Sequence, residues 1–168
     1  FLLPNMVKIR IGTLKDISQI IGLWKDFMEE HDQDVAKRNK LLKEQIIKSK
    51  TGASKFRTHI IELLKTKKGR LIVAEENGIL VGYSLAQIKK EIPVFKLKRF
   101  GLIADLYVQK EFRGQGIATQ FKDEAVKWFK RNKIKYMSIT VYPDNPHAYK
   151  IYQKWGFSDY KINMRKKI

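Results

Sequence analysis

The sequence predicts an α/β protein with a mixed central sheet of about six to seven strands and helices on both faces. Short segments of alternating apolar residues indicate strands, and segments with apolar residues at i, i+3 and i+4 indicate helices. These segments interleave, and the strand-helix-strand units at 100–142 and 135–162 require part of the sheet to be parallel. We expect one domain over 6–168, with 1–5 as a cloning remnant or an upstream extension.

The N-terminal part of the domain begins with a strand and continues with helices. Residues 7–12 alternate between apolar and polar side chains, as in a strand. Thr13 and Asp16 have the spacing of a capping box, and they open a helix whose apolar stripe runs over 17–28. Residues 35–67 predict two more helices with a break at 51–52. The first contains Leu41, Leu42 and Ile46, and the second contains Phe56, Ile60, Ile61 and Leu64.

A β-hairpin follows these helices. Asn77 and Gly78 favour the positive φ angles of a tight turn, so we expect strands at 70–75 and 79–89. Further along we expect a strand at 100–108, a helix at 114–131, a strand at 135–142, a helix at 146–155 and a final strand from 157 onward.

The composition excludes several classes of protein. There is no cysteine, which excludes disulfides and thiolate chemistry and suits a reducing, cytoplasmic location. The three histidines, His31, His59 and His147, are scattered, so we expect no metal site. No apolar run reaches the roughly 20 residues that cross a bilayer, so we expect a soluble protein without a membrane partner.

Charge is high and unevenly distributed. The formal net charge of +18 favours polyanionic partners, either nucleic acid or a phosphorylated cofactor, although general solubility would also account for it. Residues 26–34 hold five carboxylates and no Lys or Arg, whereas 37–70 hold twelve Lys and Arg and two acids. An acidic pocket on a basic body is one interpretation, and a solvated helix end is the other.

The stretch RGQGIATQF, from Arg113 to Phe121, follows a predicted strand and opens a predicted helix. It lacks the lysine of a P-loop, and Thr119 stands where a dinucleotide fingerprint needs glycine or alanine. Glycines at a helix N-terminus allow a phosphate to approach free backbone N–H groups. An ordinary strand-to-helix turn uses glycine for conformational reasons alone, so both interpretations stay open.

The motifs resemble those of the GNAT superfamily of acetyl-CoA-dependent N-acetyltransferases. Arg113, Gly116 and Ala118 fit its Q/R-x-x-G-x-G/A signature. The later stretch NPHAYKIYQKWGF is similar to its second signature, with Asn145, Ala148, Tyr152 and then Gly156 and Phe157. The resemblance extends from Met6 to the C-terminus and is weakest over 31–70.

This resemblance implies that acetyl-CoA is the co-substrate and lies in a gap between the strands at 100–108 and 135–142. It implies backbone pairing of the pantetheine arm, pyrophosphate binding by the glycine loop, and further contacts from the second signature. The implied cofactor-binding residues are Leu106, Tyr107, Val108, Arg113, Gly114, Gln115, Gly116, Ile117, Ala118, Thr119, Asn145 and Tyr152. Asn145 before Pro146 is also explained as a helix N-cap.

The resemblance also suggests the chemistry, which is direct attack of an amine on the thioester. Tyr152 is the implied general acid, although its helical spacing equally fits a core tyrosine. Asp105 is the candidate base because it lies among apolar residues, but an ion-paired structural role fits as well. Glu30 is an alternative catalytic carboxylate, and Glu29, Asp32 and Asp34 are the expected contacts of a cationic acceptor such as a polyamine or a protein amine.

Two other functions remain open at this point. A basic nucleic-acid-binding module is less favoured, because the sequence has no recognisable reader motif. A GNAT-like protein that binds acyl-CoA without catalysis is the second. The resemblance further implies that homodimers are an option.

Overall fold

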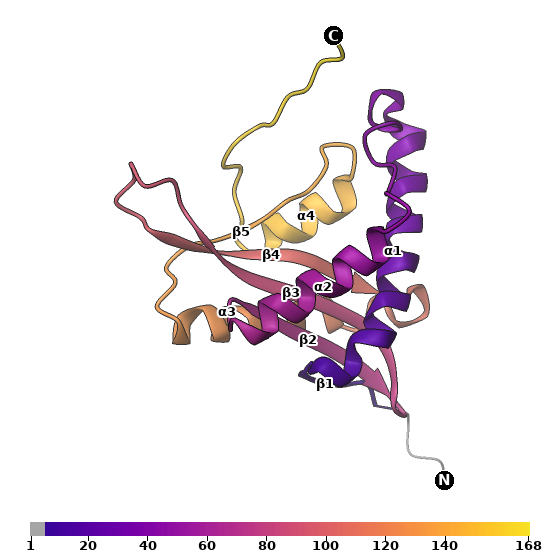
Figure 1. The fold of residues 1–168 in the computed structure, drawn as a ribbon, viewed down its shortest axis with the longest axis vertical. Helices are drawn as coiled ribbons and strands as arrows, with labels where there is room; N and C mark the ends of the chain where they lie inside the picture. Colours follow the sequence, from indigo (N-terminus) through magenta and orange to yellow (C-terminus); the bar gives the residue numbers. More distant parts are fainter. Residues whose placement is uncertain (1–5) are drawn as a thin grey trace.

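The computed structural model describes residues 6–168, so the expectation for residues 1–5 lies outside the described part. One sheet runs through the molecule in the order β1-β2-β3-β4-β5 (Figure 1). Its strands are β1 (Lys8–Ile11), β2 (Gly69–Glu76), β3 (Ile79–Lys90), β4 (Arg99–Val108) and β5 (Met137–Ile139). Neighbouring strands are antiparallel except β4 and β5, which are parallel. The prediction of a mixed α/β sheet is confirmed.

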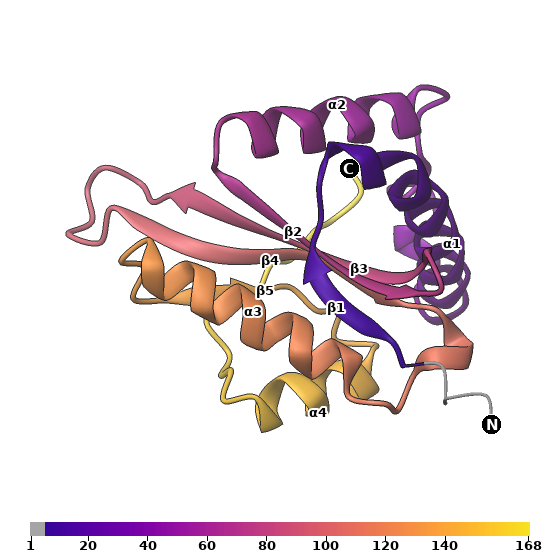
Figure 2. The same cartoon turned by 90° about the horizontal axis from the view of Figure 1, so that it is seen from below.

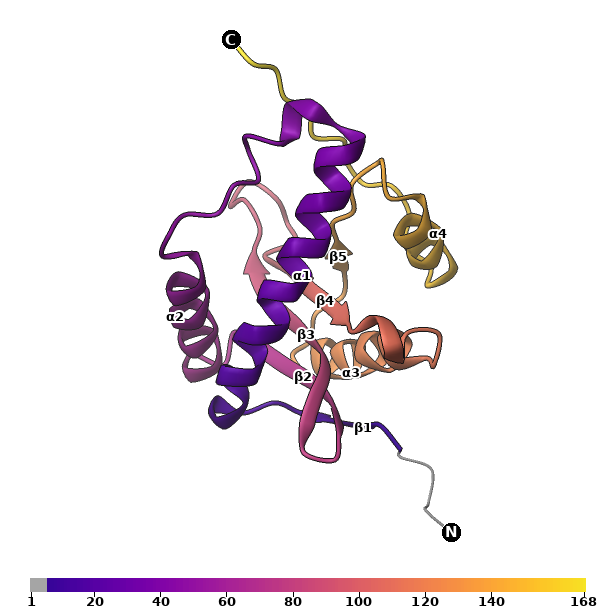
Figure 3. The same ribbon diagram turned by 90° about the vertical axis from the view of Figure 1, so that its right-hand side faces the viewer.

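Helices cover both faces of the sheet, as predicted (Figure 2 and Figure 3). The helices α1 (Ile17–Arg38) and α2 (Gly52–Lys65) lie on one face, where Ile20 and Ile60 pack around the fully buried Tyr83. The helix α3 (Ile117–Arg131) lies on the other face and buries Phe121. On this side α4 (Pro146–Lys154) follows, with Lys122 of α3 over the ring of Trp155. Among the described residues, no helix is long and apolar enough to cross a bilayer.

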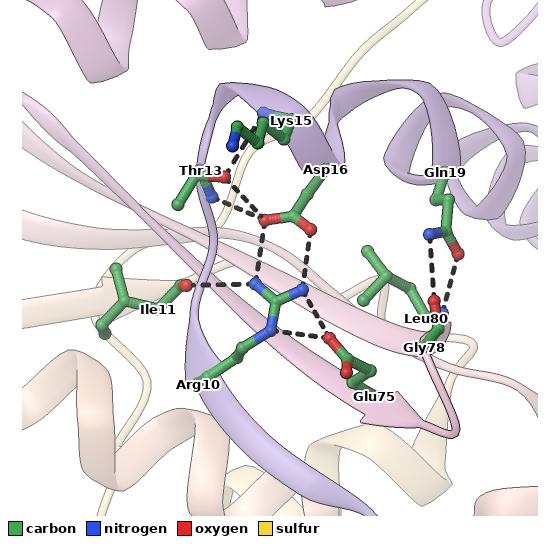
Figure 4. Close-up of polar contacts among 9 residues, drawn as sticks. All are labelled: Arg10, Ile11, Thr13, Lys15, Asp16, Gln19, Glu75, Gly78 and Leu80. Atoms are coloured by element: carbon green, nitrogen blue, oxygen red, sulfur yellow. Dashed lines mark hydrogen bonds and ion pairs between the residues drawn. The ribbon is translucent and has the colours of Figure 1, made fainter.

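Two short-range predictions are confirmed by the local geometry. Thr13 and Asp16 form a reciprocal capping box around the 3-10 turn Leu14–Asp16 that leads into α1. In Figure 4 the guanidinium of Arg10 also reaches the carboxylates of Asp16 and Glu75, at 2.8 and 2.7 Å. This hydrogen bonding outweighs burial and holds the pKa of Asp16 at about 2.

The β2–β3 turn is also as predicted. Asn77 and Gly78 have φ angles of 51° and 81°, which is the conformation that an Asn-Gly hairpin turn requires. The turn is held against α1, because the side chain of Gln19 accepts from the backbone N–H of Leu80 and donates to the carbonyl of Gly78 (Figure 4).

Three element predictions are wrong. Within residues 6–168 the sheet has five strands rather than six to seven, because the final strand expected from 157 onward is absent and no strand follows α4. The alternating side chains of Tyr160, Ile162 and Met164 are exposed there, since β5 is only three residues long and offers a short edge for pairing. The strand expected at 135–142 is correspondingly reduced to Met137–Ile139.

The third error concerns the helix expected around Leu41. Instead, α1 continues to Arg38, and a 3-10 turn at Lys40–Leu42 with further turns follows it. Leu41 is 66% exposed, so the apolar pattern at this point has no surface to bury. Helical periodicity without a packing partner was an insufficient signal.

Candidate active site

The strands β4 and β5 separate after a short parallel ladder. The last of its pairs joins Ile103 and Ile139. From there β4 continues to Val108 paired only with β3 (Figure 1). Residues 104–108 therefore have no strand partner on the β5 side, although the Val108 carbonyl accepts from the Arg113 side chain. An extended ligand can add to such an edge by backbone hydrogen bonds, as a further strand would.

A β-bulge in β4 sets the direction of the side chains along this edge. Leu85 pairs with Asp105 and Ala86 pairs with Ile103, so Ala104 is the extra residue. Beyond the bulge, Tyr107 packs in the core beneath α1, whereas Val108 packs in the core beneath α3. By alternation, Asp105 lies on the α1 side, at the point where the two strands diverge.

The loop after β4 has the geometry of an anion cradle. Gly114 and Gly116 both have φ of +79°, a conformation that favours glycine, and Gly116 caps α3. The Arg113 N–H donates to Lys110 and the Gln120 N–H donates to Gly116. Residues 114–119 lie between these two donors. Within residues 6–168, none of their backbone N–H groups donates to a protein acceptor. Free N–H groups at a helix N-terminus fit a phosphate or pyrophosphate.

The Arg113 side chain turns away from this cradle and towards α1. Its Nε donates to the Val108 carbonyl at 2.7 Å, and its terminal nitrogen lies 2.7 Å from Glu30. The Tyr107 hydroxyl donates to the other oxygen of Glu30 at 2.8 Å. Burial alone would raise the pKa of Glu30, but the hydrogen bonds from Arg113 and Tyr107 outweigh it, and the pKa is lowered. A carboxylate held this way positions its neighbours and is a weak base.

Asp105 is in a different electrostatic setting. Desolvation raises the pKa of its carboxyl group to about 6, and a hydrogen bond from the Tyr83 hydroxyl at 3.1 Å opposes part of this effect. The same desolvation and the charge of Asp105 raise the pKa of Tyr83 well above its usual value. No cation pairs with Asp105 within the described chain. The ion-pair alternative is therefore absent, and an unpaired carboxylate with a pKa of about 6 suits proton transfer.

A cavity of about 390 Å³ lies beside the end of β4. Its lining residues come from α1 and from the segment around the β4 terminus: Asp26, Glu29, Glu30, Gln33, Tyr107, Gln109, Lys110 and Glu111. Four of the lining residues are acidic and one is basic, on a chain whose net charge is +18. The acidic pocket on a basic body, expected from residues 26–34, is thus present in part.

Comparison with known proteins agrees with this geometry. The sequence profile of the acetyltransferase (GNAT) family matches residues 24–157, which is most of the chain. The chain belongs to the GNAT family. An N-alpha-acetyltransferase of Sulfurisphaera tokodaii is 28% identical over 109 residues, covering 61% of this chain and 64% of that protein. The matches to the curated relatives span 41% to 64% of the length of those proteins.

Solved structures share the GNAT fold over nearly the whole chain. A predicted acetyltransferase from Clostridium acetobutylicum, solved with acetyl-CoA, has a TM-score of 0.72 and 22% identity and covers 96% of both chains. An aminoglycoside N-acetyltransferase in complex with CoA has a TM-score of 0.75 and 16% identity, covering 99% of this chain and 98% of that one. At these identities the likeness shows the fold alone.

The acidic residues of the expected acceptor site divide into two groups in this GNAT domain. Glu29 is exposed and Glu30 is half-buried, and both line the cavity. Asp32 instead forms an ion pair with Lys48 at 2.7 Å and contacts His31, while Asp34 is exposed and outside the lining. The structure does not bring Asp32 and Asp34 together with the cavity.

Tyr152 lies on α4, and Asn145 directly precedes this helix. Neither residue takes part in the contacts of Asp105, Glu30 or Arg113. Asn145 accepts from the Ala148 N–H at 3.2 Å and precedes Pro146, which confirms the N-cap. Tyr152 is half-buried against Trp155, and burial raises the pKa of its hydroxyl. Within residues 6–168, no hydrogen bond links Tyr152 to the β4 edge. The helix α4 has no buried residue, in keeping with the missing final strand.

Sequence reasoning missed the part that Tyr83 plays. Tyr83 lies within the strand expected at 79–89 and is fully buried. Its hydroxyl matters because the hairpin register brings it to Asp105, 22 residues further along the chain. The available signal was a tyrosine in the strand that pairs with the strand of a candidate base.

Proposed function

We propose that this protein transfers the acetyl group of acetyl-CoA to a primary amine of a cationic acceptor, by direct attack within one active site. The acceptor class is a polyamine or similar small cation, or else a protein amine. The observation that carries the proposal is the carboxylate-lined cavity beside the unpaired β4 edge and the glycine cradle. Membership of the GNAT family supports the type of reaction.

The residues of the cradle and the strand edge fit acetyl-CoA. The N–H groups of 114–119 would hold its pyrophosphate, and the backbone of Leu106, Tyr107 and Val108 would align its extended arm. Arg113 supports this surface from behind, because it ties the Val108 carbonyl to Glu30. When bound, acetyl-CoA supplies the activated acyl group.

Three proton transfers would accompany the reaction. Asp105 would accept a proton from the acceptor ammonium, directly or through a water, because its pKa of about 6 leaves it ionised at neutral pH. Tyr152 would donate a proton to the departing sulfur, and its raised pKa keeps the hydroxyl protonated until then. The attacking nitrogen would lose its second proton as the C–S bond breaks, and this proton would restore the Tyr152 hydroxyl. Glu30 would act as a positioning residue, since its two hydrogen bonds fix Tyr107 and Arg113.

The acceptor preference follows from the charge of the cavity. Asp26 and Glu29 face a space large enough for a small amine, and neither is paired with a cation in the described structure. Carboxylates concentrate cations near them and repel anions. Similar proteins are named for aminoglycoside and N-alpha acetylation, and both kinds of acceptor carry amines.

The test measures thiol release from acetyl-CoA with a polyamine, a basic peptide and a neutral amine as acceptors. We expect KM for the cationic acceptors to rise about 10-fold or more in the double variant Asp26→Asn and Glu29→Gln, with a smaller change in kcat. Glu62→Gln removes an exposed carboxylate of α2 and is the matched control. Equal turnover of neutral and cationic amines by the wild type would contradict the acceptor class.

Calorimetric titration with acetyl-CoA separates this proposal from the two alternative functions. Binding that depends on Gly116, with turnover of some amine, supports an enzyme. Binding without turnover of any amine would indicate a non-catalytic acyl-CoA-binding protein. Absence of acetyl-CoA binding would overturn the assignment of the cradle itself.

A further inference from the structure

Positive charge is concentrated at the end of the sheet opposite the glycine cradle. Segments 65–70, 89–99 and 130–136, termed the cationic end, contain thirteen Lys and Arg residues and one acid, Glu91. These 24 residues of 168 hold thirteen of the 35 Lys and Arg and one of the 17 acids. The concentration exceeds what the basic composition alone would give.

The three segments meet in space although they are distant in the sequence. The Lys68 carbonyl accepts from the Ile88 N–H at 2.8 Å, which joins the start of β2 to the end of β3. The Arg99 guanidinium donates to the Asn132 carbonyl at 3.2 Å, which joins the start of β4 to the end of α3. Figure 2 shows the β3–β4 hairpin and the C-terminal end of α3 projecting in the same direction.

These cations are exposed and uncompensated. Of the thirteen, only Arg70 is partly buried, where it lies 5.7 Å from the ring of Trp128. None of them forms an ion pair with any residue of 6–168. Mutual repulsion of so many like charges destabilises the isolated fold, and a polyanion bound across them would relieve it.

Two aromatic side chains lie among the cations. Tyr136 is 66% exposed and Phe95 is 50% exposed. The Tyr136 backbone is held beside the start of β4, directly before β5, because its carbonyl accepts from the Gly101 N–H at 2.9 Å. Exposed aromatic rings beside cations bind unpaired nucleobases by stacking while the cations hold the phosphates.

We propose that the cationic end is a docking surface for RNA that has unpaired bases. RNA is favoured over an anionic bilayer because only two of the thirteen cations, Lys96 and Lys98, lie in the apolar hairpin tip at 91–98. Insertion of that tip would bring only the flanking Lys89, Lys90 and Arg99 to the lipid headgroups and would leave the eight cations of 65–70 and 130–136 unused. RNA can follow the whole face and stack on Tyr136.

Docking at this surface is compatible with acetyl-CoA binding. The cradle lies at the N-terminus of α3 and the cationic end at its C-terminus. A helix of 15 residues separates them by about 22 Å. Both ligands can therefore be bound at once, and the surface does not depend on the proposed acetylation.

The test is fluorescence anisotropy with an unstructured, labelled RNA of about 20 nucleotides over a series of salt concentrations. We expect the plot of log affinity against log salt to have a slope near −3 or steeper, from release of counterions. Replacing Lys90, Lys133 and Lys135 by Glu should weaken binding by more than about 10-fold at about 0.1 M salt and flatten the slope. Tyr136→Ala should weaken binding about 5-fold or more and leave the slope unchanged.

The matched control replaces Lys43, Lys50 and Lys55 by Glu, which removes the same charge from exposed positions elsewhere. It should change the affinity less than about 3-fold, and thermal melting verifies that each variant is folded. An equal loss in both triple variants would overturn the proposal in favour of non-specific attraction. Absence of RNA binding, with or without capture by vesicles containing anionic lipid, would also overturn it.

Discussion

The two ends of the long strand β4 use charge in opposite ways. At the C-terminal end, Glu30 and Arg113 are paired with each other, and Asp105 is desolvated and bound to Tyr83. At the N-terminal end, the cations around Arg99 are exposed and unpaired in the described structure. Catalysis needs a few groups with fixed geometry and shifted pKa values, whereas docking of a polyanion needs many groups whose charge stays in solvent.

The largest effect that separates the two ends is expected for Asp105→Asn. Loss of the proposed base should lower kcat by about 10²–10⁴-fold without changing RNA affinity. Because burial raises the pKa of Asp105 to about 6, the carboxylate takes up a proton below that pH. In the wild type, kcat/KM should therefore fall about tenfold per pH unit below about pH 6.

The measurement is the pH profile of thiol release, with acetyl-CoA binding followed by calorimetry. Binding should be retained in Asp105→Asn, since the proposed contacts of acetyl-CoA are backbone groups. A wild-type profile that is flat between pH 5 and about 8 would exclude Asp105 as the base.

The next effect concerns the cradle. Gly116→Ala places a side chain at φ of +79°, which strains the loop and displaces the free N–H groups. We expect acetyl-CoA to bind about 10-fold more weakly, with little change in RNA binding. Gly22→Ala in the exposed part of α1 is the control, and it should stabilise the protein by about 0.5–1 kcal/mol because alanine favours helix. Unchanged acetyl-CoA affinity in Gly116→Ala would refute the cradle.

How far the sequence predicted the structure depends on how far apart in the chain the interacting residues lie. Local signals succeeded: the Asn77–Gly78 turn, the Thr13–Asp16 capping box and the glycine loop depend on adjacent residues. Elements that need a distant partner failed, as with the strand expected from 157 and the helix expected around Leu41. Periodicity reports which side chains could be buried and says nothing about the surface that would cover them.

For the site, the sequence named candidate residues but did not reveal their side-chain partners. Arg113 was expected to face a phosphate, yet its guanidinium binds Glu30, 83 residues earlier in the chain. The cations of the cationic end were noticed as a basic stretch up to residue 70, but their grouping with 89–99 and 130–136 depends on sheet register. Such groupings follow from topology, which one sequence leaves open.

The smallest effect tests the partner that sequence reasoning missed. The Tyr83 hydroxyl lowers the pKa of Asp105 against the effect of burial, so Tyr83→Phe should raise that pKa. The acidic limb of the kcat/KM profile should then move to higher pH, with a lower rate at neutral pH that recovers as the pH rises. Tyr107→Phe removes a hydroxyl that binds Glu30 instead, so the midpoint of the limb should stay in place. An unshifted midpoint in Tyr83→Phe would mean that the hydrogen bond from Tyr83 does not tune the proposed base and that desolvation alone sets the pH at which it works, whereas an equal shift in both variants would mean that the effect is not specific to that hydrogen bond.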